Sequence, residues 1–347
     1  MSLINLRYDI YPQMEAYDLM DSGRYVPYAM LCGPKKYASA EINTDDMGFR
    51  FTYHKKDYVI PENIQDYSEI NILIGASTVF GVGATSDRTT ISSIISEKTG
   101  ELWLNLGNRG CNSLQEYIHL ILFLQRVKRV KRIVFLSGIN DLYLSVVNNT
   151  DCFYDQRFWM NDNLIELSIT KRVFAGFFSW LYRMPFEHIS NVRISRMPFA
   201  FINDWKTASY KIHEQTIEEK FEIYFSRYQR NFKLYKGISV AYNCEIEFFL
   251  QPFAHWIDRN HTENEAKIFD YLNELQKNET WFHVSKVLKD REIYKMLLST
   301  FHKIASEEQL KFTNCNEFLK EPVDYFVDAV HLTDEANRII ADKIIKS

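Results

Sequence analysis

Short apolar runs alternate with segments of helical spacing in the first half of the chain. Three short and mainly apolar runs predict strands that are buried on both faces, at residues 70–74, 102–106 and 133–136. Between the first two runs, isoleucines at three- and four-residue spacing predict a helix that ends near Gly100. Between the next two, Ser113 and Glu116 have the spacing of a capping box at the start of a second helix. This alternation predicts parallel strands joined by crossover helices.

The same alternation resumes in the second half of the chain. A stripe of aromatic residues predicts a helix over 217–235, and two further runs predict strands at 245–250 and 312–315. A last helix is expected from about Thr333. We therefore predict an α/β fold with three layers, α/β/α, around a parallel sheet of about five strands.

Two segments depart from this alternation. Residues 1–66 are rich in tyrosine and irregular, and we expect an N-terminal extension that packs on the core. Residues 143–210 interrupt the pattern after the third strand. Their aromatic side chains favour a helical insertion packed on the main sheet, with a lid over a functional site or a membrane-surface element as alternatives. The main domain would then comprise residues 67–142 and 211–347.

Composition and charge narrow the class of protein. The chain has 347 residues, and its net charge of -4 gives no general attraction for nucleic acid. The 5 cysteines form no C-x-x-C pair, which indicates reduced thiols. We see no secretory signal, and the longest apolar stretch, 173–182, is about half of a membrane span. We expect a cytoplasmic protein without a nucleic-acid partner or transmembrane segment and with at most weak membrane-surface contact; the oligomeric state is not indicated.

Polar residues and glycines follow the predicted strands at their carboxyl ends. Ser77 follows the first strand, Gly107 the second and Asn140 the third, while Asp328 and His331 stand three residues apart before the last helix. Ligands of open α/β sheets bind beyond the carboxyl ends of the strands, so these residues are expected to meet. A serine hydroxyl becomes a nucleophile when an oriented base takes its proton, and this set contains a serine, a base and an acid.

The order of these residues resembles the SGNH (GDSL-type) hydrolase superfamily, whose blocks carry Ser, Gly, Asn and a final Asp-x-x-His. The resemblance covers residues 67–147 and 220–346. The segment 43–50 is similar to the leader that some bacterial members carry before the first block. One departure is that the family's Gly-Asp-Ser has Ala76 in its middle position. Because that aspartate is not the acid of the triad, the departure leaves the implied chemistry intact.

The resemblance implies a role for each motif residue. Ser77 would be the nucleophile, His331 the general base and Asp328 the partner that orients the base. Gly107 and Asn140, together with the N–H of Ser77, would form the oxyanion hole. Such donors stabilise the negative charge that develops during acyl transfer.

Four further residues are expected to lie beside this site and contact substrate: Asp141, Gln251, His255 and Trp256. For the last three, which lie in the loop after the fourth strand, simple loop packing is the alternative.

We expect no metal and no organic cofactor. The glycines that begin at Gly81 resemble a dinucleotide fingerprint, but Ser86 occupies the third glycine position. His255 and His261 are six residues apart, and no C-x-x-C or H-E-x-x-H motif accompanies them as it would in a metal site.

The resemblance implies serine-dependent acyl-ester chemistry through an acyl-Ser77 intermediate. The expected substrate is an O-acyl, chiefly O-acetyl, group on a carbohydrate or another small ester. Two alternatives remain: an O-acyltransferase that passes the acyl group to a glycan, and a catalytically silent glycan-binding module.

Overall fold

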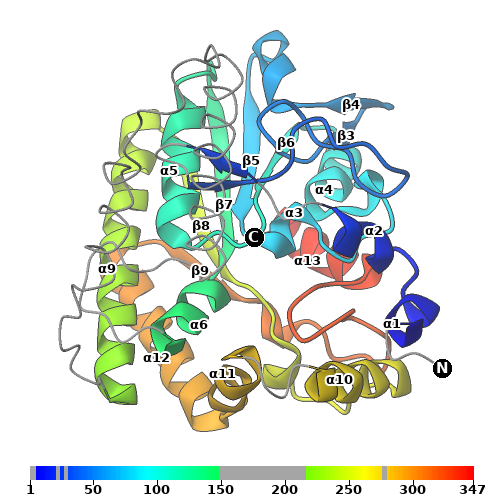
Figure 1. Cartoon of the computed structure of the whole chain (residues 1–347). Helices are drawn as coiled ribbons and strands as arrows, with labels where there is room; N and C mark the ends of the chain where they lie inside the picture. Colours follow the sequence, from blue (N-terminus) through cyan, green and yellow to red (C-terminus); the bar gives the residue numbers. More distant parts are fainter. Residues whose placement is uncertain (1–4, 21–23, 27–29, 148–215, 276–279) are drawn as a thin grey trace, which may run out of the picture.

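The computed structural model describes residues 5–20, 24–26, 30–147, 216–275 and 280–347 (Figure 1). Most of the predicted insertion at 143–210 lies outside the described residues. Its interpretation as packed helices, a lid or a membrane-surface element therefore stays a prediction.

A five-stranded parallel sheet lies at the centre of the molecule. Its strand order is β6-β5-β7-β8-β9, so the order reverses beside the first strand of the sheet. Gly75 pairs with Gly107, and all four strand pairings are parallel, so the carboxyl ends of the strands meet at one edge. The strands are β5 (Ile70–Gly75), β6 (Trp103–Gly107), β7 (Val130–Ser137), β8 (Glu245–Leu250) and β9 (Lys311–Asn314).

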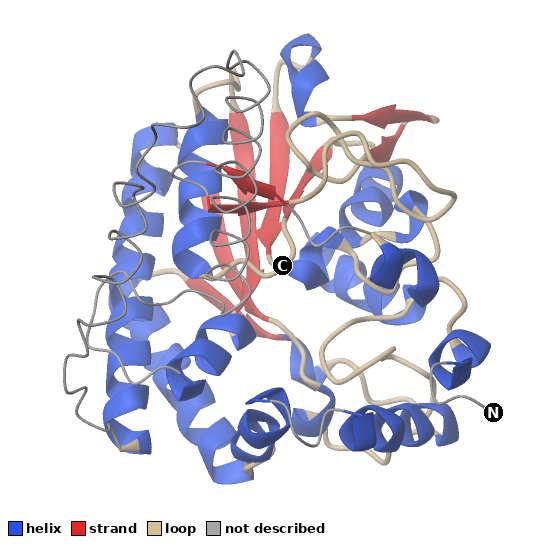
Figure 2. Cartoon of the chain, viewed as in Figure 1, coloured by secondary structure: helices blue, strands red, loops and turns tan. Residues whose placement is uncertain are grey.

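Helices cover both faces of this sheet (Figure 2). Alternate strand residues point to opposite faces, so Ile72 and Ile74 belong to one hydrophobic core and Leu73 to the other. The first core is closed by α5 (Ser113–Leu124), α9 (Ile217–Tyr242), α11 (Thr280–Leu288) and α12 (Arg291–Glu308). The second is closed by α4 (Ile91–Thr99), α10 (Glu263–Leu275) and α13 (Asp334–Lys346). The predicted three-layer α/β/α fold is confirmed.

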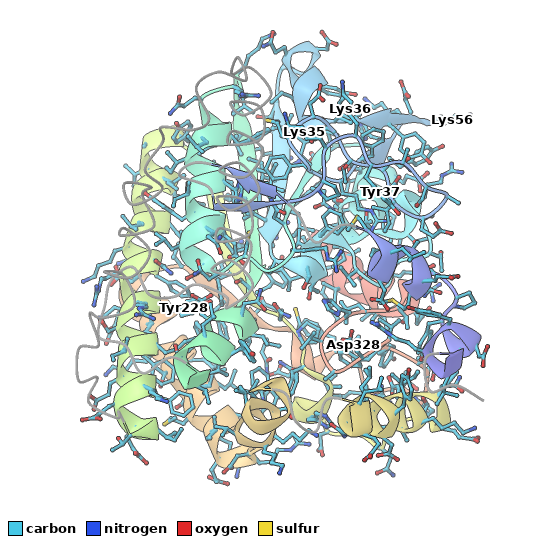
Figure 3. The ribbon with its side chains drawn as sticks, in the orientation of Figure 1. Lys35, Lys36, Tyr37, Lys56, Tyr228 and Asp328 are labelled. Carbon is cyan, nitrogen blue, oxygen red and sulfur yellow. The ribbon has the colours of Figure 1, made fainter. Side chains whose placement is uncertain are left out.

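The aromatic stripe of α9 packs on the sheet as its spacing predicts. Tyr228 and Phe232 are fully buried, and the ring of Phe232 lies 5.0 Å from that of Phe248 in β8. Phe301 of α12 contacts the same group, with its ring 4.9 Å from that of Tyr228. Figure 3 labels Tyr228 on α9. These rings fill the space between the two helices and the sheet, where each buries a large apolar area.

The capping box of α5 lies one residue earlier than the sequence suggested. Asn112 accepts a hydrogen bond from the backbone of Gln115, whose side chain accepts one from the Asn112 N–H in return. The predicted partner Glu116 is buried instead and accepts a hydrogen bond from Ser137 Oγ. The predicted cap residue Ser113 bonds to Asp141. The prediction was wrong because both positions face the interior, where other polar groups compete for them.

The described part of the N-terminal segment is tied to the main domain through a buried arginine. Arg50 is fully buried, and its Nε lies 2.7 Å from Asp87 Oδ1. Its Nη1 also donates to the Tyr17 hydroxyl at 2.7 Å and to the Gly81 carbonyl at 2.8 Å. This segment contains α1 (Asn5–Ile10), α2 (Met14–Leu19), β1 (Arg24–Val26), β2 (Met30–Cys32), β3 (Thr52–His54), β4 (Asp57–Val59) and η1 (Pro61–Asp66).

The remaining elements connect strands to helices. They are α3 (Ser77–Phe80), η2 (Asp87–Thr89), α6 (Ile139–Val147), η5 (Ala254–Trp256) and η6 (Cys315–Glu317). Within the described part of the chain, none of the helices combines the length and the apolar character needed to cross a bilayer.

Candidate active site

The catalytic candidates lie on two segments beyond the sheet edge. Ser77 is the first residue of α3, directly after β5, and Asp328 and His331 lie on the loop that precedes α13. Figure 3 labels Asp328 on this loop. The loop is closed by a hydrogen bond from the Val327 N–H to the His331 carbonyl at 3.0 Å. Asp328 Oδ1 accepts from the N–H groups of Val330 and His331 at 2.9 and 2.8 Å, so the local sequence itself forms this turn.

The structure brings Ser77, His331 and Asp328 into one hydrogen-bonded chain. His331 Nε2 lies 2.8 Å from Ser77 Oγ, and His331 Nδ1 lies 2.6 Å from Asp328 Oδ2. The carboxylate accepts a hydrogen bond from the Nδ1–H of His331, which leaves Nε2 unprotonated and able to accept the hydroxyl proton. The geometry is that of a nucleophile, a base and an orienting acid.

The carboxyl of Asp328 is held in its charged form. Burial by itself would raise the pKa of Asp328, but His331, Arg7 and the Val330 N–H together hold that pKa below its usual range. An ionised Asp328 keeps the proton of the imidazole on Nδ1.

A cavity of about 280 Å³ opens over the triad. Its lining contains the three triad residues and several side chains from other elements: Arg7, Gly110, Asn140, His255, Phe269, Leu272, Asn273, Ser285, Lys289, Ala329 and Val330. Arg7 and Lys289 were not predicted, because neither lies in a motif, and Gly110 was not distinguished from Gly107 in the same segment after the second strand.

Asn140 points an amide into this cavity. Its Nδ2 donates one hydrogen bond to the Cys111 carbonyl at 2.6 Å. An amide nitrogen carries two hydrogens, so a second donor remains for a ligand. The bond to Cys111 fixes the rotation of the side chain, which preorganises that donor.

Gly110, and not Gly107, lies at the cavity wall. The N–H of Gly107 already donates to Asn105 Oδ1 at 2.9 Å. A Cβ at Gly107 would lie 2.1 Å from the backbone nitrogen of Phe80, so this glycine permits the close approach of α3 to β6. Gly110 has a φ of 72° and lines the cavity, which suits it to present a backbone N–H to a ligand. Both glycines follow the second strand, and the sequence alone did not separate their roles.

Asp141 is part of the core and does not line the cavity. It is 1% exposed, and its carboxylate accepts from the N–H and the hydroxyl of Ser113 at 2.9 and 2.7 Å. The Tyr228 hydroxyl lies 3.2 Å from the same carboxylate. Burial raises the pKa of Asp141, while the Ser113 and Tyr228 bonds act in the opposite direction. Asp141 therefore fastens the start of α6, and with it Asn140, to α5.

Gln251 and Trp256 are buried as well and reach the site only through neighbours. Gln251 Nε2 donates to Thr78 Oγ1 at 3.1 Å, which holds the residue after Ser77 in place. The Trp256 indole donates to the Leu288 carbonyl at 2.6 Å. The expectation that these two and Asp141 contact substrate is not supported by their positions, because the polar atoms of each face the interior.

His255 does lie at the cavity wall. Burial, followed by the charges of Lys289, His261 and Arg291, lowers its pKa to about 3. The imidazole is therefore neutral at physiological pH and can donate or accept a hydrogen bond without a charge. The backbone N–H of the preceding residue, Ala254, donates to the Ala329 carbonyl at 3.0 Å. This bond attaches the loop after β8 to the loop that carries Asp328 and His331.

Within the described residues, no cluster of three or more His, Cys, Asp or Glu side chains is arranged to hold a metal ion.

A comparison with solved structures finds esterases that align with this chain at low identity. No family model matches the sequence, and no curated protein matches it. An acetyl xylan esterase, AlAXEase, aligns with a TM-score of 0.36 and 12% identity over 80% of this chain and 98% of that chain. A carbohydrate acetylesterase family member from Sinorhizobium meliloti aligns with a TM-score of 0.38 and 13% identity over 80% of this chain and 97% of that chain.

Proposed function

We propose that this protein is a serine-dependent acyl ester hydrolase with Ser77 as its nucleophile. One observation carries the proposal, the hydrogen-bonded triad at a cavity wall. Ser77 Oγ lies 2.8 Å from His331 Nε2, and His331 Nδ1 lies 2.6 Å from Asp328 Oδ2. All three side chains line the cavity. This arrangement supports turnover rather than silent binding, because a binding module has no need of an oriented base beside a serine.

Acylation would begin when Ser77 Oγ attacks the carbonyl carbon of the ester. His331 Nε2 takes the hydroxyl proton as the new C–O bond forms, and Asp328 stabilises the resulting imidazolium. His331 then gives this proton to the leaving alcohol oxygen as the ester C–O bond breaks. The products of this half-reaction are the free alcohol and an acyl-Ser77 ester.

The charge on the carbonyl oxygen would be stabilised by three donors. They are the N–H of Ser77, the N–H of Gly110 and the free hydrogen of Asn140 Nδ2. In this proposal Gly110 replaces Gly107, because the Gly107 N–H is already bonded to Asn105. Donors fixed by the protein need no reorganisation as the charge develops.

Deacylation repeats the same steps with water as the attacking group. His331 takes a proton from water, the water oxygen attacks the acyl carbon, and Ser77 Oγ leaves with the proton from His331. The carboxylic acid is released and the free enzyme is restored. An O-acyltransferase would use a glycan hydroxyl in place of water at this step. A lid formed by residues 143–210 would favour transfer, because it would shield the acyl-enzyme from water.

A short O-acyl group on a carbohydrate is the substrate that we propose. The cavity of about 280 Å³ is small, which favours an acetyl group and the sugar ring that carries it over a long acyl chain. The resemblance to bacterial SGNH hydrolases that carry a leader, here residues 43–50, supports the same class of substrate.

Labelling with a fluorophosphonate probe and peptide mapping test this proposal. We expect one adduct, on Ser77, and we expect Ser77→Ala to lose both labelling and hydrolysis of p-nitrophenyl acetate. Ser299→Ala is the matched control, since Ser299 lies exposed on α12 and bonds to the Met296 carbonyl. Acetylated sugars, with and without an acceptor glycan, then separate hydrolysis from transfer. An adduct on another serine, or no adduct at all, would overturn the assignment.

A further inference from the structure

A cation from the first helix contacts the acid of the triad. Arg7 lies on α1, and its Nη2 atom is 3.3 Å from Asp328 Oδ2, across 321 positions of sequence. The two side chains are 15% and 14% exposed, so the pair forms part of the cavity wall. A fully exposed ion pair would contribute little, whereas this one is largely shielded from solvent.

Arg7 completes a full set of donors around the Asp328 carboxylate. Oδ1 accepts from the N–H groups of Val330 and His331, and Oδ2 faces both His331 Nδ1 and Arg7. A carboxylate offers about four acceptor positions, so a donor stands at each of them. Three donors belong to the catalytic loop itself. Among the described residues, Arg7 is the donor that comes from a distant element.

A second acid fixes the guanidinium in place. Arg7 Nη1 lies 2.7 Å from Asp18 Oδ2 on α2, and the Tyr8 hydroxyl donates to the same oxygen at 3.1 Å. The guanidinium therefore spans two carboxylates with its two terminal nitrogens. A lysine has a single charged nitrogen and does not have this planar geometry.

We propose that Arg7 is a positioning residue of the triad, which holds the Asp328 carboxylate against His331 and makes the N-terminal helices part of the active site. This inference rests on the proposed function for the role of the triad. Burial would raise the pKa of Asp328, but His331 and then Arg7 lower it. The Arg7 charge also opposes a second positive charge on the adjacent imidazole. The Arg7 charge therefore acts on the imidazole that has to accept the serine proton.

Other charged or titratable groups face this pair from the surrounding described elements. The Tyr8 hydroxyl bonds to Asp18, and Tyr271 of α10 interacts electrostatically with both Arg7 and Asp18. Asp18 lies beside Arg7, and Arg109 donates to the Tyr17 carbonyl at 3.2 Å. His255 and Lys289 line the opposite part of the cavity. His255 is neutral, as described above, and the charges of Asp18, Arg109 and Lys289 are retained when Arg7 is replaced. Replacing Arg7 by methionine therefore removes one positive charge next to Asp328.

The test compares pH–rate profiles of Arg7→Met, Arg7→Lys and Asp18→Asn. In Arg7→Met, we expect the ascending limb of kcat/KM for p-nitrophenyl acetate to move to higher pH by about 0.3 to 1 unit. On the alkaline plateau, kcat should fall about 2- to 10-fold with little change in KM. Arg7→Lys should keep the wild-type limb. Asp18→Asn should move the limb to lower pH, since it removes a negative charge. The control is Arg129→Met, because Arg129 pairs with Glu69 before β5, at the other end of the sheet.

An NMR titration of the His331 ring separates this inference from the proposed function. We expect the same shift in its midpoint in Arg7→Met, whether or not any ester is hydrolysed. If the wild-type protein does not react with the fluorophosphonate, the proposed function is refuted. The NMR titration still tests the effect of Arg7 on His331 in that case. A folded Arg7→Met with unchanged limb and unchanged midpoint would overturn the inference. An equal loss of rate at every pH, with a lower Tm, would do the same. If Arg7→Met does not fold, the opposite shift in Asp18→Asn decides the question.

Discussion

His331 Nε2 lies 2.8 Å from Ser77 Oγ, although 254 positions separate the two residues in the chain. The distance depends on how the loop before α13 packs against the turn after α3. A Cβ at Gly83, in that turn, would lie 2.4 Å from the Leu332 carbonyl oxygen. Val327 and Leu332, on either side of the catalytic loop, are buried in the second core. The contact between Ser77 and His331 is therefore set by the same core that carries α4 and α13.

Replacement of His331 should lower kcat more than replacement of Asp328. We expect His331→Ala to lower kcat by roughly 10⁵- to 10⁶-fold and Asp328→Ala by roughly 10⁴-fold, because loss of Asp328 weakens orientation while the base remains. Steady-state hydrolysis of p-nitrophenyl acetate measures both variants. Near-normal turnover in His331→Ala would be incompatible with the proposed mechanism.

Asn140→Ala should lower kcat by about 100- to 1,000-fold and leave KM nearly unchanged, because an oxyanion donor acts mainly in the transition state. The matched control is Asn273→Ala, since Asn273 also lines the cavity but has no donor role in the proposed mechanism. Its kcat should change less than about 10-fold, in line with loss of one peripheral contact. If Asn140→Ala altered KM alone, Asn140 would be a ground-state contact.

Gly107→Ala tests the structural role of this glycine. The added Cβ would meet the Phe80 backbone at 2.1 Å, so α3 must move away from β6. We expect a loss of about 3 kcal/mol in the free energy of unfolding. Gly100→Ala is the control. Gly100 has a positive φ, of 71°, but a Cβ there meets nothing within 4 Å, so the cost should be only about 1 kcal/mol. Urea denaturation measures both variants, and equal costs would contradict the packing argument.

The buried carboxyl of Glu116 predicts a pH-dependent stability. Burial, followed by the charge of Asp141, raises the pKa of Glu116 well above its ordinary value. A raised pKa in the folded state means that the stability contribution is complete below the unfolded pKa and is lost as pH rises through the folded pKa. Glu116→Gln removes this charge and keeps an acceptor for Ser137. We expect the variant to be about 1 to 3 kcal/mol more stable than wild type at alkaline pH. The difference should vanish below pH 4, and Tm measured across this range checks the sign.

The sequence by itself determined the strands and the local geometry of the catalytic loop. Short apolar runs such as 70–74, which Asn71 alone interrupts, are typical of strands buried between two layers of helices, so they identified the buried parallel strands. The spacing of Asp328 and His331 also predicted that the two side chains meet within one turn. A carboxylate three residues before a histidine can bond to the backbone of its own turn, which makes the geometry a property of the local sequence.

Only the tertiary structure decided which polar residues near the strand ends face the cavity. Asp141 directly follows Asn140, yet one carboxylate turns into the core and one amide faces the cavity. Gly107 and Gly110 are three residues apart, yet Gly107 allows close packing of α3 on β6 and Gly110 lines the cavity. Arg7 reaches the triad from a segment that has no motif at all. The physical reason is that a side chain's direction beyond a strand end depends on the turn that follows and on what packs against it. Those contacts come from distant parts of the chain, and no local pattern encodes them.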